Sequence, residues 1–165
     1  MNRRSWQMLL PHIGDLPRVV LGKDAFVFAA AKGHPLASGK RPLKPAELEG
    51  ERVLFLDDGH CFREQALSFC SRAGAEEADY RATSLLTLVQ MTAGGAGVTL
   101  LPSLALAVEN RHRQLSVRPF APKAPFRTLA LVWRRGAALE STLEAIGQTL
   151  KEAYETLEGR LSAAR

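Results

Sequence analysis

Short apolar runs alternate with helical patterns along this chain, and this alternation constrains its fold more than any other feature. Runs rich in β-branched and aromatic residues, bounded by turn residues, predict strands. The predicted strands are 18–21, 25–31, 52–56, 80–83, 98–101, 115–119 and 128–133. A helix is predicted at 61–73, closed by Gly74, and a second helix, capped by Ser84, runs to residue 93. A capping box at Ser141 begins a long amphipathic helix. This order of elements favours an α/β domain with a mainly parallel sheet.

Size and composition exclude several classes of protein. With 165 residues, 46% of them hydrophobic and 24% charged, the chain can bury a core and differs from a disordered segment. No apolar stretch approaches the length of a membrane span. The basic start is interrupted by Pro11, His12 and Asp15, so no signal peptide is predicted. We therefore expect a cytoplasmic protein with no membrane partner.

The excess of positive charge is modest and dispersed. The net charge is +5 at pH 7, and small basic groups occur at residues 3–4, 111–113 and 134–135. No aromatic-flanked basic stripe and no recognition helix accompanies them in the sequence. The charge therefore favours a solvated surface over a nucleic-acid-binding face.

The sequence does not match the patterns that bind nucleotides or metals. The glycines at 94–97 follow a predicted helix and open a strand, which is the reverse of the order in dinucleotide-binding loops. His60 and Cys61 are adjacent and Cys70 is distant, which is a poor spacing for zinc. Adjacent residues on a helix do not face one another, so His60 is a poor general base for Cys61. We expect no cofactor, no bound metal and no enzymatic activity.

The two cysteines occupy contrasting positions on the predicted helix 61–73. Cys61 lies at its start, where free backbone amides, the helix dipole and nearby Arg63 favour a thiolate. Cys70 belongs to an apolar face and is expected to be buried. Their Cα atoms are about 13 Å apart on an ideal helix, whereas a disulfide requires about 7 Å or less. Joining them would therefore unwind the helix. From the residues alone, two inert cysteines remain the simpler interpretation.

The residues around these cysteines resemble a known family. Residues 56–66, Leu-Asp-Asp-Gly-His-Cys-Phe-Arg-Glu-Gln-Ala, followed by Phe69 and Cys70, are similar to the redox segment of the OxyR family. That family is the peroxide-sensing group of the LysR-type transcription regulators. The similarity continues at 33–37, 73–75, 81–85, 95–102 and 127–134. The redox segment is specific to the OxyR family, whereas the pieces at 34–37 and 100–102 indicate LysR-type regulators in general.

The resemblance implies a role for each of five residues. Cys61 is implied as the peroxidatic thiolate that becomes a sulfenic acid, and Cys70 as the thiol that resolves it to a disulfide. His60 and Arg127 fall where the family places residues that orient peroxide, and Arg63 matches as a third peroxide-binding residue. The implied function is the hydrogen-peroxide-sensing regulatory domain of an oxidative-stress transcription activator. The implied partners are hydrogen peroxide, a thiol reductant such as glutaredoxin, and further copies of the chain in a homo-oligomer.

The resemblance also implies a periplasmic-binding-protein-like α/β fold with one nearly complete and one partial subdomain. Residues 24–127 are expected to form the distal redox subdomain. Residues 1–23 are expected to form part of the proximal subdomain, and 128–165 to return to it with the C-terminal helix. Residues 1–18 are an atypical start of unknown origin.

Two other functions stay open at this point. The first is a LysR-type effector domain that binds a small anionic ligand, with the cysteines incidental. The second is a thiol peroxidase, which is disfavoured because the sequence contains no Cys-x-x-Cys recycling motif. The winged helix-turn-helix of LysR-type regulators has no counterpart in this sequence. DNA binding is therefore expected only through a domain absent from this chain.

Overall fold

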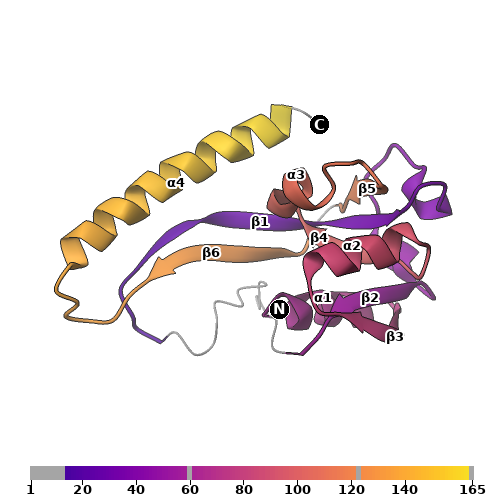
Figure 1. Ribbon diagram of the computed structural model, residues 1–165, viewed down its shortest axis with the longest axis horizontal. Coiled ribbons are helices and arrows are strands. Elements are labelled where there is room, and N and C mark those ends of the chain that lie inside the picture. The colour runs from indigo at the N-terminus through magenta and orange to yellow at the C-terminus, as the bar shows by residue number, and fades with distance from the viewer. Residues whose placement is uncertain (1–13, 59–60, 122–123, 164–165) are drawn as a thin grey trace, which may run out of the picture. The chain divides into compact units, whose positions relative to one another are not determined.

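The computed structural model describes residues 14–58, 61–121 and 124–163 (Figure 1). Residues Ala25–Arg127 form one compact unit, and the described residues on either side of it form a second, flanking unit. Strands β1 (Arg18–Ala31) and β6 (Phe126–Val132) belong in part to each. None of the helices in the described ranges combines the length and apolar character that crossing a bilayer requires.

The flanking unit consists of the first part of β1, most of β6 and the long helix α4 (Glu140–Ala163). Strand β6 pairs with β1. A Cβ at Gly22 would lie 2.0 Å from Cε1 of Tyr154, so the glycine lets this ring lie directly on the strand. The Tyr154 hydroxyl donates a hydrogen bond to the Lys23 carbonyl oxygen at 2.5 Å. The sequence predicts two strands here, 18–21 and 25–31. Strand β1 is continuous instead, because Gly22 serves close packing rather than a turn.

The unit Ala25–Arg127 contains strands of two sheets. In the first sheet, β1 lies between β4 (Thr99–Pro102) and β5 (Leu115–Pro119) and is antiparallel to both. In the second, β2 (Arg52–Leu56) and β3 (Glu76–Ala82) are parallel. The prediction of a mainly parallel sheet is therefore wrong for the first sheet. Strands β4 and β5 run in the opposite direction to β1. The alternation of strands and helices in the sequence does not specify the direction in which these strands run.

Two helices of this unit, α1 (Cys61–Arg72) and α2 (Leu85–Ala93), pack against β2 and β3. The Ser84 side chain caps α2 by accepting a hydrogen bond from the Thr87 amide at 3.1 Å, as predicted. Gly74 lies just beyond the end of α1 with φ of +77°, which also agrees with the prediction. Short 3-10 turns lie at Pro35–Ala37, Pro45–Leu48 and Ser103–Ala105, and the short helix α3 at Leu106–Glu109.

One cluster of buried apolar residues joins the strands and helices of this unit. Its members include Phe26 and Phe28 from β1, Leu54 from β2, Phe62 from α1, Leu88 from α2 and Leu100 from β4. Phe26 packs edge-on against Phe62, with ring centroids 5.0 Å apart. Burying one such ring stabilises the fold by about 1.5–3 kcal/mol. The contact between these rings fixes the first turn of α1 to β1.

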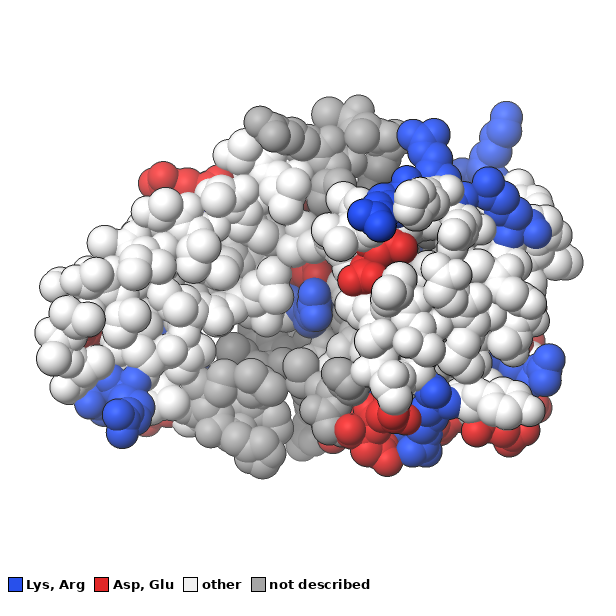
Figure 2. All heavy atoms as spheres, viewed as in Figure 1, with Lys and Arg blue, Asp and Glu red and all other residues white. Residues whose placement is uncertain are grey.

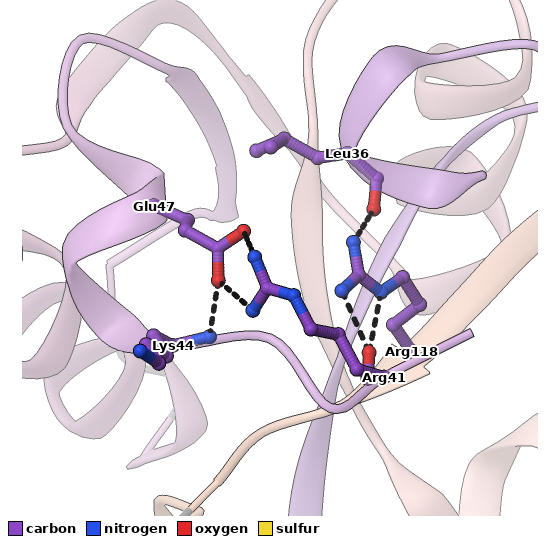
Figure 3. A network of polar contacts seen from close by, with 5 residues as sticks. All are labelled: Leu36, Arg41, Lys44, Glu47 and Arg118. Carbon is purple, nitrogen blue, oxygen red and sulfur yellow. Dashed lines mark hydrogen bonds and ion pairs between the residues drawn. The ribbon is translucent and has the colours of Figure 1, made fainter. Parts of the chain in front are cut away.

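A buried arginine ties a surface loop to β5 (Figure 3). Arg118 donates hydrogen bonds to the carbonyl oxygens of Leu36 and Arg41, the latter at 3.0 Å from Nε and 2.6 Å from Nη2. The Arg41 side chain pairs with Glu47 at 2.8 Å. The hydrogen bonds from Arg41 and from the Lys44 amide hold the pKa of Glu47 below its usual value. The loop between the first two 3-10 turns is therefore fixed at both of its ends.

Candidate functional site

The connection between β2 and α1 positions the first of the predicted site residues. Strand β2 ends at Leu56, and the Asp57 amide donates a hydrogen bond to the Ala82 carbonyl oxygen at 3.0 Å. Helix α1 then begins at Cys61, where the sequence predicts a helix start. His60 and the side chain of Cys61 lie outside the described residues. The first backbone amides of a helix lack intrahelical acceptors, so the start of α1 favours an anion such as a thiolate.

Cys70 lies in the apolar core of the unit, as the sequence predicts. Its exposure is 1%, and it is a free thiol. Burial raises the pKa of this thiol to about 12. Phe62 and Ala66, on the preceding two turns of α1, are buried in the same core. Cys70 is therefore a protonated thiol at neutral pH and packs as a small hydrophobic residue.

The C-terminal end of α1 is closed directly beyond Cys70. The Ala75 amide donates a hydrogen bond to the Cys70 carbonyl oxygen at 3.1 Å, and the Gly74 amide donates one to Ser71 at 3.2 Å. These two bonds, with the positive φ of Gly74, form a Schellman motif. Phe69 packs edge-on against a neighbouring aromatic ring, with centroids 5.1 Å apart. The backbone around Cys70 is therefore held by the helix end and by core packing together.

The two cysteines belong to one continuous helix in this conformation. A helix rises about 1.5 Å per residue, so their Cα atoms are separated by about 13 Å along its axis. A disulfide requires Cα atoms within about 7 Å. This conformation therefore corresponds to the dithiol state, and a Cys61–Cys70 disulfide can form only if α1 unwinds between them.

Arg63 takes part in a closed set of ion pairs that links α1 to β3. Its Nη1 lies 3.2 Å from Oδ1 of Asp58, and its Nη2 lies 2.7 Å from Oε1 of Glu77. Arg81 contacts the same two carboxylates, at 2.9 Å from Asp58 and 3.2 Å from Glu77. We call these four residues the ion-pair ring. The ring joins the start of α1 and the connection before it to strand β3.

The members of the ion-pair ring differ in their exposure to solvent. The Arg63 side chain is 10% exposed and that of Glu77 31%, whereas that of Asp58 is 75% exposed. The pair between Arg63 and Glu77 is therefore the best shielded contact of the ring. The Nε of Arg63 is buried and has no hydrogen-bond partner within the described residues. The guanidinium thus depends on its two carboxylates for most of its stabilisation.

Glu77 and Arg81 are site residues that the sequence reasoning missed. They lie four positions apart on a strand, and residues at this spacing share a face. Ala78 and Ala82, also four positions apart, are buried in the core. This alternation of charged and small apolar residues is the one signal in the sequence: it can place Glu77 and Arg81 on one face of a strand, but it does not indicate their partners. Acidic and basic side chains adjoin at the lower right of Figure 2, in the region of β3 in Figure 1. Basic side chains also gather at the upper right of that face, where acidic side chains adjoin them.

The structure places three predicted site residues, Cys61, Arg63 and Cys70, on α1. Arg127 lies on β6, where it is half-buried. Within the ranges that the structure describes, no three His, Cys, Asp or Glu side chains are arranged to hold a metal ion. The described residues therefore offer a helix that begins at Cys61 and carries a buried thiol at Cys70, together with a buried cation held by carboxylates.

Comparisons with known sequences show what this chain is similar to. Residues 8–155 match the family described as LysR substrate binding domain. The hydrogen peroxide-inducible genes activator of Dickeya chrysanthemi is 40% identical over 146 residues, which are 88% of this chain and 48% of that protein. The DNA-binding transcriptional dual regulator OxyR of Escherichia coli K12 is 40% identical over 134 residues, 81% of this chain and 44% of that protein. The chain thus spans about half the length of these curated relatives.

Solved structures are also similar. A cysteine-to-serine mutant of Corynebacterium glutamicum OxyR with bound hydrogen peroxide has a TM-score of 0.80 and 29% identity, over 94% of this chain and 50% of that one. The reduced form of OxyR has a TM-score of 0.75 and 35% identity, over 87% and 67%. The oxidised form has a TM-score of 0.72 and 38% identity, over 87% and 68%. These similarities confirm the predicted periplasmic-binding-protein-like fold.

Proposed function

Because this chain belongs to the LysR substrate-binding domain family, we propose that it is the hydrogen-peroxide-sensing regulatory domain of a LysR-type transcription factor. One observation carries this proposal: α1 begins at Cys61 and buries Cys70, so both cysteines belong to one helix and Cys70 is held in the core. Relatives named as activators of hydrogen-peroxide-inducible genes support it, as do the similar structures of reduced and oxidised OxyR.

The proposed chemistry is a two-step oxidation of the cysteine pair. The Cys61 thiolate attacks the O–O bond of hydrogen peroxide and becomes a sulfenic acid, while the other oxygen leaves as hydroxide and takes up a proton to become water. The Cys70 sulfur then attacks the sulfenic sulfur, a disulfide forms and a second water leaves. Two electrons from a thiol reductant, such as glutaredoxin, return the pair to the dithiol. The high pKa of Cys70 keeps this thiol protonated, which supports Cys61 as the thiol that reacts first.

Three further residues are proposed to act on peroxide. His60 and Arg127 would orient the peroxide and stabilise the leaving oxygen, as the family resemblance implies. Arg63 would contribute positive charge near the start of α1. Its terminal nitrogens contact Asp58 and Glu77, so this charge is partly neutralised.

Disulfide formation is proposed to act as a switch because it changes conformation. Unwinding α1 removes Cys70, Phe62 and Ala66 from their places in the core. The changed surface would alter the contacts of this domain with the other parts of a homo-oligomeric cytoplasmic regulator. That regulator would contact DNA through a separate helix-turn-helix domain. Residues 24–127 would form the redox subdomain, flanked by 1–23 and 128–165. The relatives are transcription regulators, and this function requires no catalytic turnover.

The experiment that tests this function is thiol mapping by mass spectrometry. The chain is treated with a low molar excess of hydrogen peroxide, its remaining thiols are alkylated, and its peptides are analysed. A disulfide-linked peptide pair containing Cys61 and Cys70 is expected, and a Cys70→Ser variant should not form it. Complete alkylation of both thiols after treatment would overturn the proposal. It would favour instead a LysR-type effector domain that binds a small anion, with incidental cysteines.

A further inference from the structure

The ion-pair ring spans the boundary between the part of the chain that must move on oxidation and a part that need not. Arg63 lies between the two cysteines, within the helical segment that a disulfide would unwind. Glu77 and Arg81 belong to β3, which is paired along β2 outside that segment. The ring's contacts therefore exist in the helical dithiol state. They depend on the position that α1 gives to Arg63.

The burial of the residues in the ring indicates which of its contacts contributes most to stability. The Arg63 guanidinium is largely buried, and its Nη2 lies 2.7 Å from Glu77, whose side chain is itself only partly exposed. Charge-assisted hydrogen bonds of this length are stronger than neutral ones, and removing one partner leaves the other charge poorly solvated. The buried Nε of Arg63 has no partner in the described part of the chain, so no other described contact compensates for a lost carboxylate. Arg81 completes the ring and holds both carboxylates in place.

From these contacts we propose that Glu77 and Arg81 are positioning residues that set the redox potential of the Cys61–Cys70 pair. They act through Arg63 by stabilising α1 in the dithiol state, which makes the disulfide easier to reduce. This inference rests on the proposed disulfide switch. Stabilising a dithiol relative to its disulfide raises the reduction potential of the couple. Removal of Glu77 destabilises the dithiol state, so it favours the disulfide and lowers the reduction potential of the cysteine pair.

The variant Glu77→Gln tests this inference in the full chain. The disulfide and dithiol forms are equilibrated with oxidised and reduced glutathione and quantified by thiol alkylation. The equilibrium constant should shift about tenfold toward the disulfide, which equals about 30 mV for this two-electron couple. Arg81→Gln should shift it in the same direction. Asp79→Asn is the matched control, because it removes one exposed carboxylate from β3 without touching the ring.

A second measurement on the same proteins does not depend on the disulfide. In the dithiol state, amide hydrogen exchange in the first two turns of α1 should be faster in Glu77→Gln than in wild type or Asp79→Asn. If wild type forms no disulfide, the proposed function fails and this inference fails with it. If wild type forms the disulfide but Glu77→Gln has the wild-type potential and wild-type exchange, the function stands and the inference is wrong. A shift of the same size in Asp79→Asn would also contradict it, because the effect would then arise from net charge.

Discussion

Replacing Gly74 by alanine should loosen the end of α1 that carries Cys70. Gly74 has φ of +77°, a conformation that an L side chain adopts at a cost of about 1–2 kcal/mol. An added Cβ would lie 3.3 Å from Cγ of the exposed Glu49 side chain, which can move away, so backbone strain is the main effect. A change of 1.4 kcal/mol is about tenfold in population. The open population of this helix end should therefore rise about five- to thirtyfold.

The assay is the rate at which Cys70 is alkylated in the native protein. Cys61→Ser removes the only other cysteine, so the rate reports on Cys70 alone. Because Cys70 is buried, alkylation requires local opening, and its rate should rise by the same factor as the open population. Exchange of the Ala75 amide, which is bonded to the Cys70 carbonyl oxygen, should rise in parallel.

Gly95→Ala provides the matched control for this experiment. Gly95 has φ of +81° just beyond the end of α2, and an added Cβ would meet no atom within 4 Å. Its substitution therefore imposes a similar backbone strain on a different helix. The reasoning is refuted if Gly74→Ala and Gly95→Ala raise the Cys70 alkylation rate equally, because Cys70 would then be exposed only by global unfolding.

Three further predictions concern the thiols and the flanking unit. Cys61→Ser should abolish oxidation by peroxide, whereas Cys70→Ser should leave a sulfenic acid on Cys61 that dimedone traps; equal dimedone labelling of both cysteines in wild type would contradict this. Burial raises the pKa of Cys70 to about 12, above about 8.5 for an unfolded thiol, so the folded state holds this proton more tightly. The contribution of this proton to the free energy of unfolding is fully present at neutral pH and is lost as the pH rises above about 8.5. The free energy of unfolding of Cys61→Ser, measured in urea, should therefore fall more steeply between about pH 8 and 10 than that of Cys61→Ser/Cys70→Ala. Gly22→Ala should displace the Tyr154 ring and lower stability by about 1–3 kcal/mol in urea denaturation, whereas Gly159→Ala, where an added Cβ meets nothing, should cause no loss.

Local patterns predicted much of the fold because local contacts determine those elements. Ser84 and Gly74 act within their own helix ends, through a side-chain cap and a positive φ, and both were recognisable from residue type. The burial of Cys70 followed from its place on the apolar face of one helix. The predicted break between the strands 18–21 and 25–31 is wrong, because Gly22 in that gap packs against Tyr154, which is remote in the sequence.

The ion-pair ring could not be predicted, because it depends on how β2 and β3 pair. The predicted strand, 80–83, begins four residues later than β3, which starts at Glu76. With that boundary, Glu77 falls in a loop and its side chain has no defined direction. Asp58 and Arg81 are 23 positions apart in sequence and come together only through the parallel register of the two strands. The direction of β4 and β5 along β1 is likewise a property of the folded sheet.

The central claim is that oxidation joins Cys61 to Cys70 by unwinding α1, and amide hydrogen exchange in the two redox states tests it most directly. The dithiol and disulfide forms are compared peptide by peptide. Exchange across 61–72 should rise strongly in the disulfide form, because the helical hydrogen bonds between the cysteines must break. Exchange across residues 128–132 of β6 should change little. A disulfide that forms while exchange across 61–72 stays at its dithiol level would contradict the account.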